Sequence, residues 1–228
     1  MSNSELTSDS YVIKRCPKTG VALSIIDRVT GDLIHATNRT LNTVNSDAFD
    51  GLLVPVLNRW IAKHVGGVVA DIAGGEHSRC AIEIANRYPQ IGTVINVDWT
   101  ARPVLNNPGI KVIAGDLTNL DRLLPQSSID LAYSSYLLPM LPRYKEDYDQ
   151  IAILSALTAC MNRGGLALIH ESPSYFQRRY SQELIRSGAL EGIFASGVGD
   201  SFLVLAKEED PAQNPAFFSI KLDPIVTL

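Results

Sequence analysis

The sequence predicts an α/β protein: a doubly wound, mostly parallel sheet of seven strands, helices on both faces and an antiparallel C-terminal hairpin. Short apolar runs alternate with helical patterns from residue 68 onward, which is typical of parallel sheets. Several of these runs end at acidic residues, at the edge where such sheets bind ligands. The length of 228 residues, 46% of them hydrophobic, suffices for one large domain with a small N-terminal extension.

The N-terminal extension, residues 1–65, is expected to contain a β-meander and one helix. Three β-rich runs separated by turn signals lie between residues 11 and 36. Apolar residues then recur at helical spacing over residues 46–64, and Gly66-Gly67 ends this pattern. Pro55 stands inside it, so it either shifts the start of the helix or kinks it.

The main domain, residues 66–228, carries the alternating pattern. Apolar runs of strand length are found at 68–72, 93–97, 111–114, 129–134, 166–169, 192–197 and 201–206. Helical patterns are found at 77–88, 146–161 and 174–187. Right-handed crossovers between parallel strands place such helices on both faces of the sheet. Residues 197–200 join the last two strands, which predicts the hairpin.

The composition narrows the classes of function. A formal net charge of −4 argues against a dedicated nucleic-acid binder, which usually shows a basic surface. The three cysteines, Cys16, Cys80 and Cys160, lack metal-ligand spacing, so neither a metal site nor a disulfide framework is expected. The sequence shows no signal peptide and no apolar run long enough for a membrane helix, which predicts a cytoplasmic protein. It leaves the oligomeric state open, a homodimer included.

The stretch from Val68 to His77 organises the chain. Small and β-branched residues lead to Asp71, and Gly74 and Gly75 permit a sharp turn into the helical pattern behind them. Free amides at the start of that helix then face a ligand above the strand ends. Each acid at a strand end could instead cap a turn, but together they favour a ligand. The polar residues at strand ends are Asp71, Asp98, Asp116, Ser134, Ser135, His170 and Glu171.

With these motifs, residues 68–206 resemble the class I S-adenosylmethionine-dependent methyltransferases. Asp71-Ile-Ala-Gly-Gly-Glu-His77 is similar to the family's first motif, Asp-x-Gly-x-Gly-x-Gly, with Ala73 and His77 in the first and third glycine positions. Residues 130–135 resemble the fourth motif, and residues 162–165 resemble the turn before the fifth strand. The resemblance implies a methyltransferase whose cofactor is S-adenosyl-L-methionine. The cofactor-binding residues it implies are Asp71, Ala73, Gly74, Gly75, Asp98, Trp99, Asp116, Leu117 and Ser134.

The resemblance also implies roles for some of these residues. Asp98 matches the acid that holds the ribose hydroxyls, and residues 115–117 are similar to the segment that reads the adenine. A catalytic base is needed only when the acceptor must lose a proton. Tyr136, His170 and Glu171 are the candidates, and His170 suits the task best because histidine titrates near neutral pH.

The methyl acceptor is predicted to be a small, partly hydrophobic molecule. The fourth motif lacks the Asn/Asp-Pro-Pro-Tyr/Phe pattern of nucleic-acid base methylation, which points away from DNA and RNA. The N-terminal extension and the apolar residues 137–142 are the natural lid over the acceptor site. A protein acceptor stays open as an alternative.

Two other interpretations of the glycine turn stay open. A dinucleotide-binding fold requires the motif Gly-x-Gly-x-x-Gly and an acid about 20 residues later. Asp98 fits as the acid, but Glu, His and Ser follow Gly75, so the last glycine of the motif is missing. A cationic sulfonium suits an acidic pocket better than phosphates do, so the methyl donor is favoured. Alternatively the chain is a non-catalytic scaffold whose donor site has decayed around Ala73 and His77. His77 is then an exposed residue at the helix start, a substrate contact or a steric block.

Overall fold

The structure, a computed structural model, describes most of the chain's central part and several shorter segments. The described residues are 11–15, 22–29, 33–36, 39–49, 51–104, 107–135, 150–170, 192–196, 202–207 and 222–224. Three features expected from the sequence lie outside them: the helix at 174–187, the turn at 197–200 and the loop at 137–142.

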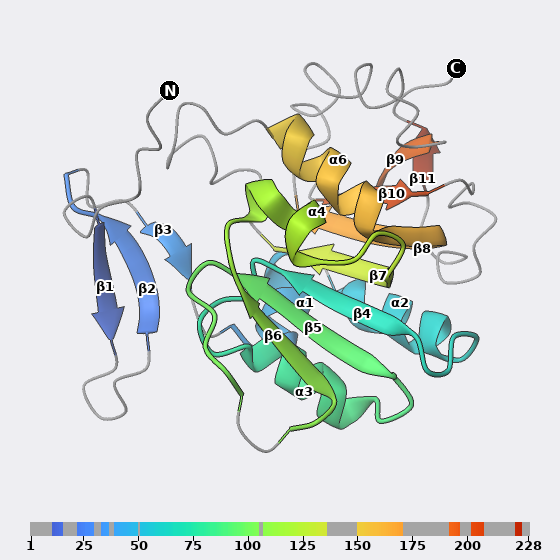
Figure 1. Cartoon of the computed structure of the whole chain (residues 1–228), viewed down its shortest axis with the longest axis horizontal. Coiled ribbons are helices and arrows are strands. Elements are labelled where there is room, and N and C mark those ends of the chain that lie inside the picture. Colours follow the sequence, from blue (N-terminus) through green and yellow to red (C-terminus); the bar gives the residue numbers. More distant parts are fainter. Residues whose placement is uncertain are drawn as a thin grey trace.

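The main sheet follows the predicted alternation. Its strands are β4 (Val68–Ile72), β5 (Thr93–Asp98), β6 (Ile110–Ala114), β7 (Ile129–Ser134), β8 (Met161–His170), β9 (Gly192–Ser196), β10 (Phe202–Ala206) and β11 (Leu222–Pro224). Within the described segments these eight strands lie in the order β11-β9-β10-β8-β7-β4-β5-β6 (Figure 1). The five neighbours from β8 to β6 run parallel, which confirms the predicted α/β class.

The far edge of the sheet is antiparallel. β10 pairs antiparallel with both β8 and β9, and β11 pairs antiparallel with β9. The sheet therefore has one strand more than the seven that the sequence predicts. The additional strand, β11, is three residues long and includes Pro224, so it carries too short a pattern to be recognised from the sequence.

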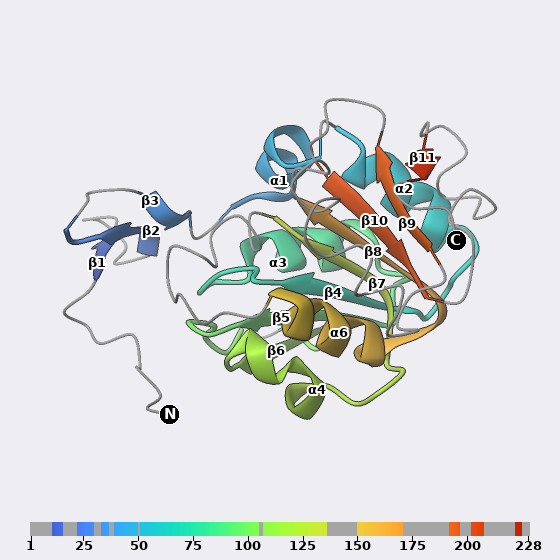
Figure 2. The same cartoon turned by 90° about the horizontal axis from the view of Figure 1, so that it is seen from above.

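Helices cover both faces of the parallel part (Figures 1 and 2). One face, here called the α3 face, packs against α1 (Leu41–Asp47), α2 (Leu53–Ile61) and α3 (Arg79–Arg87). The opposite face, here called the α6 face, packs against η1 (Leu117–Asn119), α4 (Leu120–Leu123) and α6 (Gln150–Cys160). Alternate residues of β4 divide between the two cores: Val69 joins the α3 face, and Ala70 and Ile72 join the α6 face.

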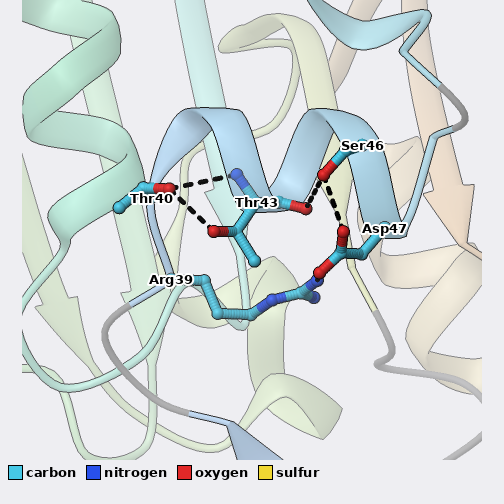
Figure 3. A network of polar contacts seen from close by, with 5 residues as sticks. All are labelled: Arg39, Thr40, Thr43, Ser46 and Asp47. Atoms are coloured by element: carbon cyan, nitrogen blue, oxygen red, sulfur yellow. Dashed lines mark hydrogen bonds and ion pairs between the residues drawn. The ribbon is translucent and has the colours of Figure 1, made fainter.

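The single helix predicted over residues 46–64 is wrong, because two helices occupy this region. Thr40 caps α1 by accepting a hydrogen bond from Thr43 N at 3.0 Å (Figure 3). Gly51, with φ of +81°, then breaks the helical path before α2 begins at Leu53. Pro55 is the third residue of α2, where an N–H group has no acceptor within the helix. Pro55 therefore lies in the first turn of a helix and does not kink one, which agrees with the prediction that it shifts the helix start.

The N-terminal strands form a separate sheet. β1 (Tyr11–Arg15), β2 (Ala22–Asp27) and β3 (Leu33–Ala36) pair antiparallel in chain order. Both views show these strands lying to one side of the main sheet (Figures 1 and 2). The helices α1 and α2 instead pack on the main sheet and contribute Val44, Leu57 and Trp60 to its α3-face core. The domain boundary at residue 65 stays a prediction.

The segment predicted as a turn at residues 162–165 lies within β8. Gly164 has φ of +73°, and the register between β7 and β8 shifts between Ile129 and Leu131. Such a shift bends a strand without ending it. None of the helices in the described segments is long and apolar enough to cross a membrane.

Candidate functional site

The candidate site lies at the carboxyl ends of the parallel strands, where the chain changes direction across the sheet. From β4 the chain proceeds outward to β5 and β6, and it then returns to place β7 on the other side of β4. Ligands of open parallel sheets bind above such a switch point. The turn at residues 73–78 follows β4 there, Asp98 ends β5, and Ser134 ends β7.

The turn after β4 has a tightly defined backbone. Ala73, Gly75 and Ser78 all have positive φ, of 62°, 86° and 52°. Ala73 N donates to Val97 O at 2.8 Å, which anchors the start of the turn to β5. A Cβ on Gly74 would overlap Asn96 Oδ1 and the Asp71 carboxyl, so this position requires glycine. Ala73 pays about 1 kcal/mol for a left-handed conformation that glycine adopts freely.

Asp98 ties this turn to the end of β5. Its Oδ2 accepts a hydrogen bond from Gly75 N at 3.0 Å, and its side chain is buried. Its Oδ1 accepts from Thr100 N at 2.8 Å and from Thr100 Oγ1 at 2.6 Å. The carboxylate thus holds the glycine turn and the segment after β5 together, a structural role that the predicted contact to a ribose did not include.

Asp116 repeats the local part of this arrangement at the end of β6. Its Oδ1 accepts from Thr118 N at 3.0 Å and from Thr118 Oγ1 at 2.8 Å, which caps η1. Unlike Asp98, the Asp116 side chain is only partly buried. Leu117, the next residue, points into the α6-face core, so its side chain serves packing. A ligand beside η1 would therefore meet Asp116 and the backbone of Leu117.

Glu76 forms a second link between the two strand-end segments. Its side chain is buried and forms an ion pair with the Arg102 guanidinium, while Arg102 N donates to Glu76 O at 2.9 Å. His77 lies on the other side of the carboxylate, with Nε2 at 3.6 Å from Glu76 Oε2. Arg102 was not among the residues predicted from the sequence, because no motif relates a residue after β5 to the turn after β4. The negative charge of Glu76 is therefore balanced within the protein.

His77 precedes α3, since that helix begins at Arg79. Its side chain is 29% exposed and lies beside Glu76, so it belongs to the charged group that borders the turn.

Asp71, predicted to bind the cofactor, faces α3 beneath the turn. It pairs in register with Tyr133 of β7 and with Asn96 of β5, and its side chain is fully buried. The pKa of Asp71 is raised to about 7, chiefly by burial and to a smaller extent by the nearby Asp98, while a hydrogen bond with Tyr133 and the charge of Arg39 oppose the rise. The Tyr133 hydroxyl also donates to Cys80 Sγ at 3.3 Å, and burial raises the pKa of both groups.

The remaining predicted residues lie at or near the same edge. Trp99 follows β5 with 36% of its surface exposed, and Ser134 ends β7 fully buried. Ser134 Oγ has no hydrogen-bond partner among the described residues, so it is available to a ligand. His170 is the last residue of β8, one position beyond Ile169, which pairs with Ser134. Tyr136 and Glu171 lie outside the described residues.

Replacing Arg102 by methionine is expected to destabilise the protein by about 1 to 2 kcal/mol, because Glu76 is then buried without its guanidinium partner. Methionine keeps the apolar stem of the side chain. Denaturant unfolding measures the loss, and the double variant Glu76→Gln with Arg102→Met is expected to regain most of it.

The matched control is Arg79→Met, which breaks the exposed pair of Arg79 with Glu83 at 3.3 Å. An exposed pair of this kind contributes less than about 0.5 kcal/mol. Equal losses for the two arginine variants would contradict a special role of the Glu76–Arg102 pair.

Comparison with known proteins gives structural likeness only. No family model matches the chain, and no curated protein matches it. The chain is similar to the structure of MNMC2 from Aquifex aeolicus, with TM-score 0.53 and 13% identity, covering 88% of this chain and 71% of that one. For an S-adenosyl-L-methionine-dependent methyltransferase assigned in Methanococcus maripaludis, the TM-score is 0.47 at 14% identity, covering 77% and 98%. For a protein described as a probable spermidine synthase from Corynebacterium glutamicum, the TM-score is 0.48 at 14% identity, and the match covers 92% of this chain and 81% of that one. At 13% identity the likeness to the Aquifex aeolicus structure shows the fold alone, and function has to be argued from residues.

Proposed function

We propose that this chain, which has the fold of the class I S-adenosylmethionine-dependent methyltransferases, binds S-adenosylmethionine and transfers its methyl group to a small-molecule acceptor. One observation carries the proposal: the turn after β4, in which Gly74 has no room for a side chain, is hydrogen-bonded through Gly75 to the acid that ends β5. The two sequence motifs that resemble the donor-binding motifs of the family are thus joined in one site.

The residues at the strand ends suit such a donor. The backbone from Ala73 to Gly75 would face its amino-acid end, and Ser134 Oγ, buried and without a partner among the described residues, offers a further polar contact. Trp99 presents an exposed aromatic ring at the end of β5 that is suited to stacking on a purine. Asp98 and Asp116 give the ribose and adenine ends an acidic border that favours a cation over phosphates.

The chemistry places few demands on the protein. S-adenosylmethionine supplies a methyl group already activated on a sulfonium. The protein's contribution is to hold the acceptor in line with that methyl group and to exclude water, for which a rigid turn is an asset. His170, at the end of β8, is the proposed base for acceptors that must lose a proton, with Tyr136 as the second candidate.

The second candidate function is a non-catalytic scaffold of the same fold. The positive φ of Ala73 and the position of His77 beside Glu76 are the features that keep it open. A dinucleotide ligand is a third and weaker candidate, because no phosphate-approach glycine follows Gly75.

Titration calorimetry of the full chain with S-adenosylmethionine and S-adenosylhomocysteine tests the proposal. We expect binding of both with Kd in the micromolar range, and no binding of NAD⁺ or NADP⁺. In Trp99→Ala the affinity is expected to fall about tenfold, because loss of an aromatic stacking partner costs about 1 kcal/mol or more. Absence of heat and of any thermal shift with both ligands would favour the scaffold, and binding of NAD⁺ alone would favour the dinucleotide.

A further inference from the structure

The amide of Asn96 has a fixed orientation beneath the glycine turn. Its Nδ2 donates to Gly75 O at 3.0 Å and to Ser78 Oγ at 2.6 Å. Because a backbone carbonyl can only accept, the NH₂ group must lie on that side, and a flipped amide would lose this bond. Asn96 Oδ1 is therefore an acceptor, and it is directed toward Gly74 and Asp71.

Two buried acceptors meet at this point. A Cβ on Gly74 would overlap both Asn96 Oδ1 and Asp71 Oδ2, so the two oxygens converge beside Gly74. Neither oxygen has a hydrogen-bond partner among the described residues, and both side chains are buried. An ionised carboxylate facing an amide oxygen in a buried site is unfavourable, since both groups only accept. A single proton on Asp71 would turn the repulsion into a hydrogen bond.

We propose that Asp71 keeps its proton in the folded protein up to about neutral pH and that its hydroxyl donates to Asn96 Oδ1, clamping the turn from Gly74 to Ser78 from below. Asp71 and Asn96 are then positioning residues: they hold the turn, and Asp71 does not meet the ligand as a carboxylate. This inference concerns the turn itself and holds whether or not the site binds S-adenosylmethionine.

The surroundings of Asp71 agree with a neutral acid. The ionisable groups packed against it are Tyr133 from β7, Cys80 from α3, Asp98 from β5 and Arg39 before α1. Tyr133 and Cys80 are neutral at pH 7, because burial raises the pKa of each. Burial is the largest influence and raises the pKa of Asp71 from 3.8 to about 7, with a smaller contribution in the same direction from the negative Asp98. The hydrogen bond with Tyr133 and the charge of Arg39 favour the ionised form, and burial outweighs them.

A defined pH dependence of stability follows. The folded protein holds the Asp71 proton more tightly than the unfolded chain does. The contribution of Asp71 to the free energy of unfolding therefore falls as pH rises from about 4 to about 7 and is constant above that. Asp71→Asn replaces the hydroxyl by an amide that donates to Asn96 at any pH. Relative to wild type, the folding equilibrium constant of Asp71→Asn is expected to rise about tenfold for each pH unit from about pH 4 to about pH 7, ~10³-fold in all, and to stay constant up to pH 8.

The experiment is urea unfolding of wild type, Asp71→Asn and Asp71→Ala between pH 4 and pH 8, with ¹³Cγ NMR of labelled aspartates. We expect Asp71→Asn to match or exceed wild type at pH 8, Asp71→Ala to be less stable throughout, and one carboxyl resonance to titrate near pH 7. Asp116→Asn, the same substitution of a partly exposed acid at another strand end, is the control variant. Equal losses for Asp71→Asn and Asp71→Ala, with every carboxyl titrating below pH 5, would overturn the inference. Neither readout requires a donor, so failure here is distinguishable from failure of the proposed function.

Discussion

Replacing Gly74 by alanine is expected to abolish measurable donor binding and to lower the free energy of unfolding by about 2 to 3 kcal/mol. The added methyl would overlap Asn96 Oδ1 and the Asp71 carboxyl. Neither side chain can move freely, because Asn96 donates to Gly75 O and Ser78 Oγ and Asp71 lies buried between β5 and β7. The turn must therefore move, and a displacement of about 1 Å in a positioning element costs about a hundredfold in function.

Gly109→Ala is the matched control for this substitution. Gly109 lies in the turn before β6, and a Cβ there would meet only Asn107 Oδ1, at 3.6 Å, an ordinary contact. We expect its stability to change by less than about 0.5 kcal/mol and its donor affinity to stay at the wild-type value. Calorimetry and urea unfolding measure both variants. If Gly74→Ala binds the donor as wild type does, the turn is not where the donor lies.

The parallel part of the fold was predictable because its signals are local. A run such as Val68–Ile72, buried on both faces, is apolar except for Asp71, and β4 and β7 have the predicted bounds. The two helices before β4 were not predictable. The helical spacing of apolar residues from 46 to 64 continues through Gly51, which has positive φ, and the cap of α1 is the single residue Thr40. The spacing of apolar residues cannot reveal a helix break that depends on the backbone angle of one residue.

The candidate site was predictable in place and less so in geometry. That Asp71 and Asp98 end neighbouring strands followed from the pattern. That Asp71 faces α3 and meets Asn96 depends on strand register, and the Glu76–Arg102 pair depends on the path of two loops in space. Interactions between residues more than 20 positions apart leave no periodic signal in one sequence, so these had to come from the structure.

Replacing Asp98 by alanine is expected to cost about 3 kcal/mol of stability and to reduce donor affinity at least a hundredfold. The substitution leaves the buried Gly75 N and the partly buried Thr100 N and Thr100 Oγ1 without their acceptor. Each buried donor left unsatisfied costs about 1 to 3 kcal/mol, part of which water entering the cavity recovers. Because the core of the sheet does not involve this carboxylate, the protein should still fold, with the glycine turn released from β5.

Asp116→Ala is the control that distinguishes the hydrogen bond from Gly75 to Asp98 from the bonds that each acid accepts from the threonine two residues on. Both acids accept from the backbone N and the hydroxyl of the threonine two residues on, but only Asp98 also accepts from Gly75. Loss of a cap alone costs about 1 kcal/mol, so Asp116→Ala should be the milder variant in unfolding. Asp98→Asn keeps the shape of the side chain but turns an NH₂ group toward one of the N–H or O–H groups that Asp98 accepts from. The affinity of this variant for S-adenosylmethionine should therefore fall nearly as far as that of Asp98→Ala. If Asp98→Ala and Asp116→Ala lose stability and affinity equally, the bond to Gly75 contributes nothing, and the donor site does not depend on the link between β4 and β5.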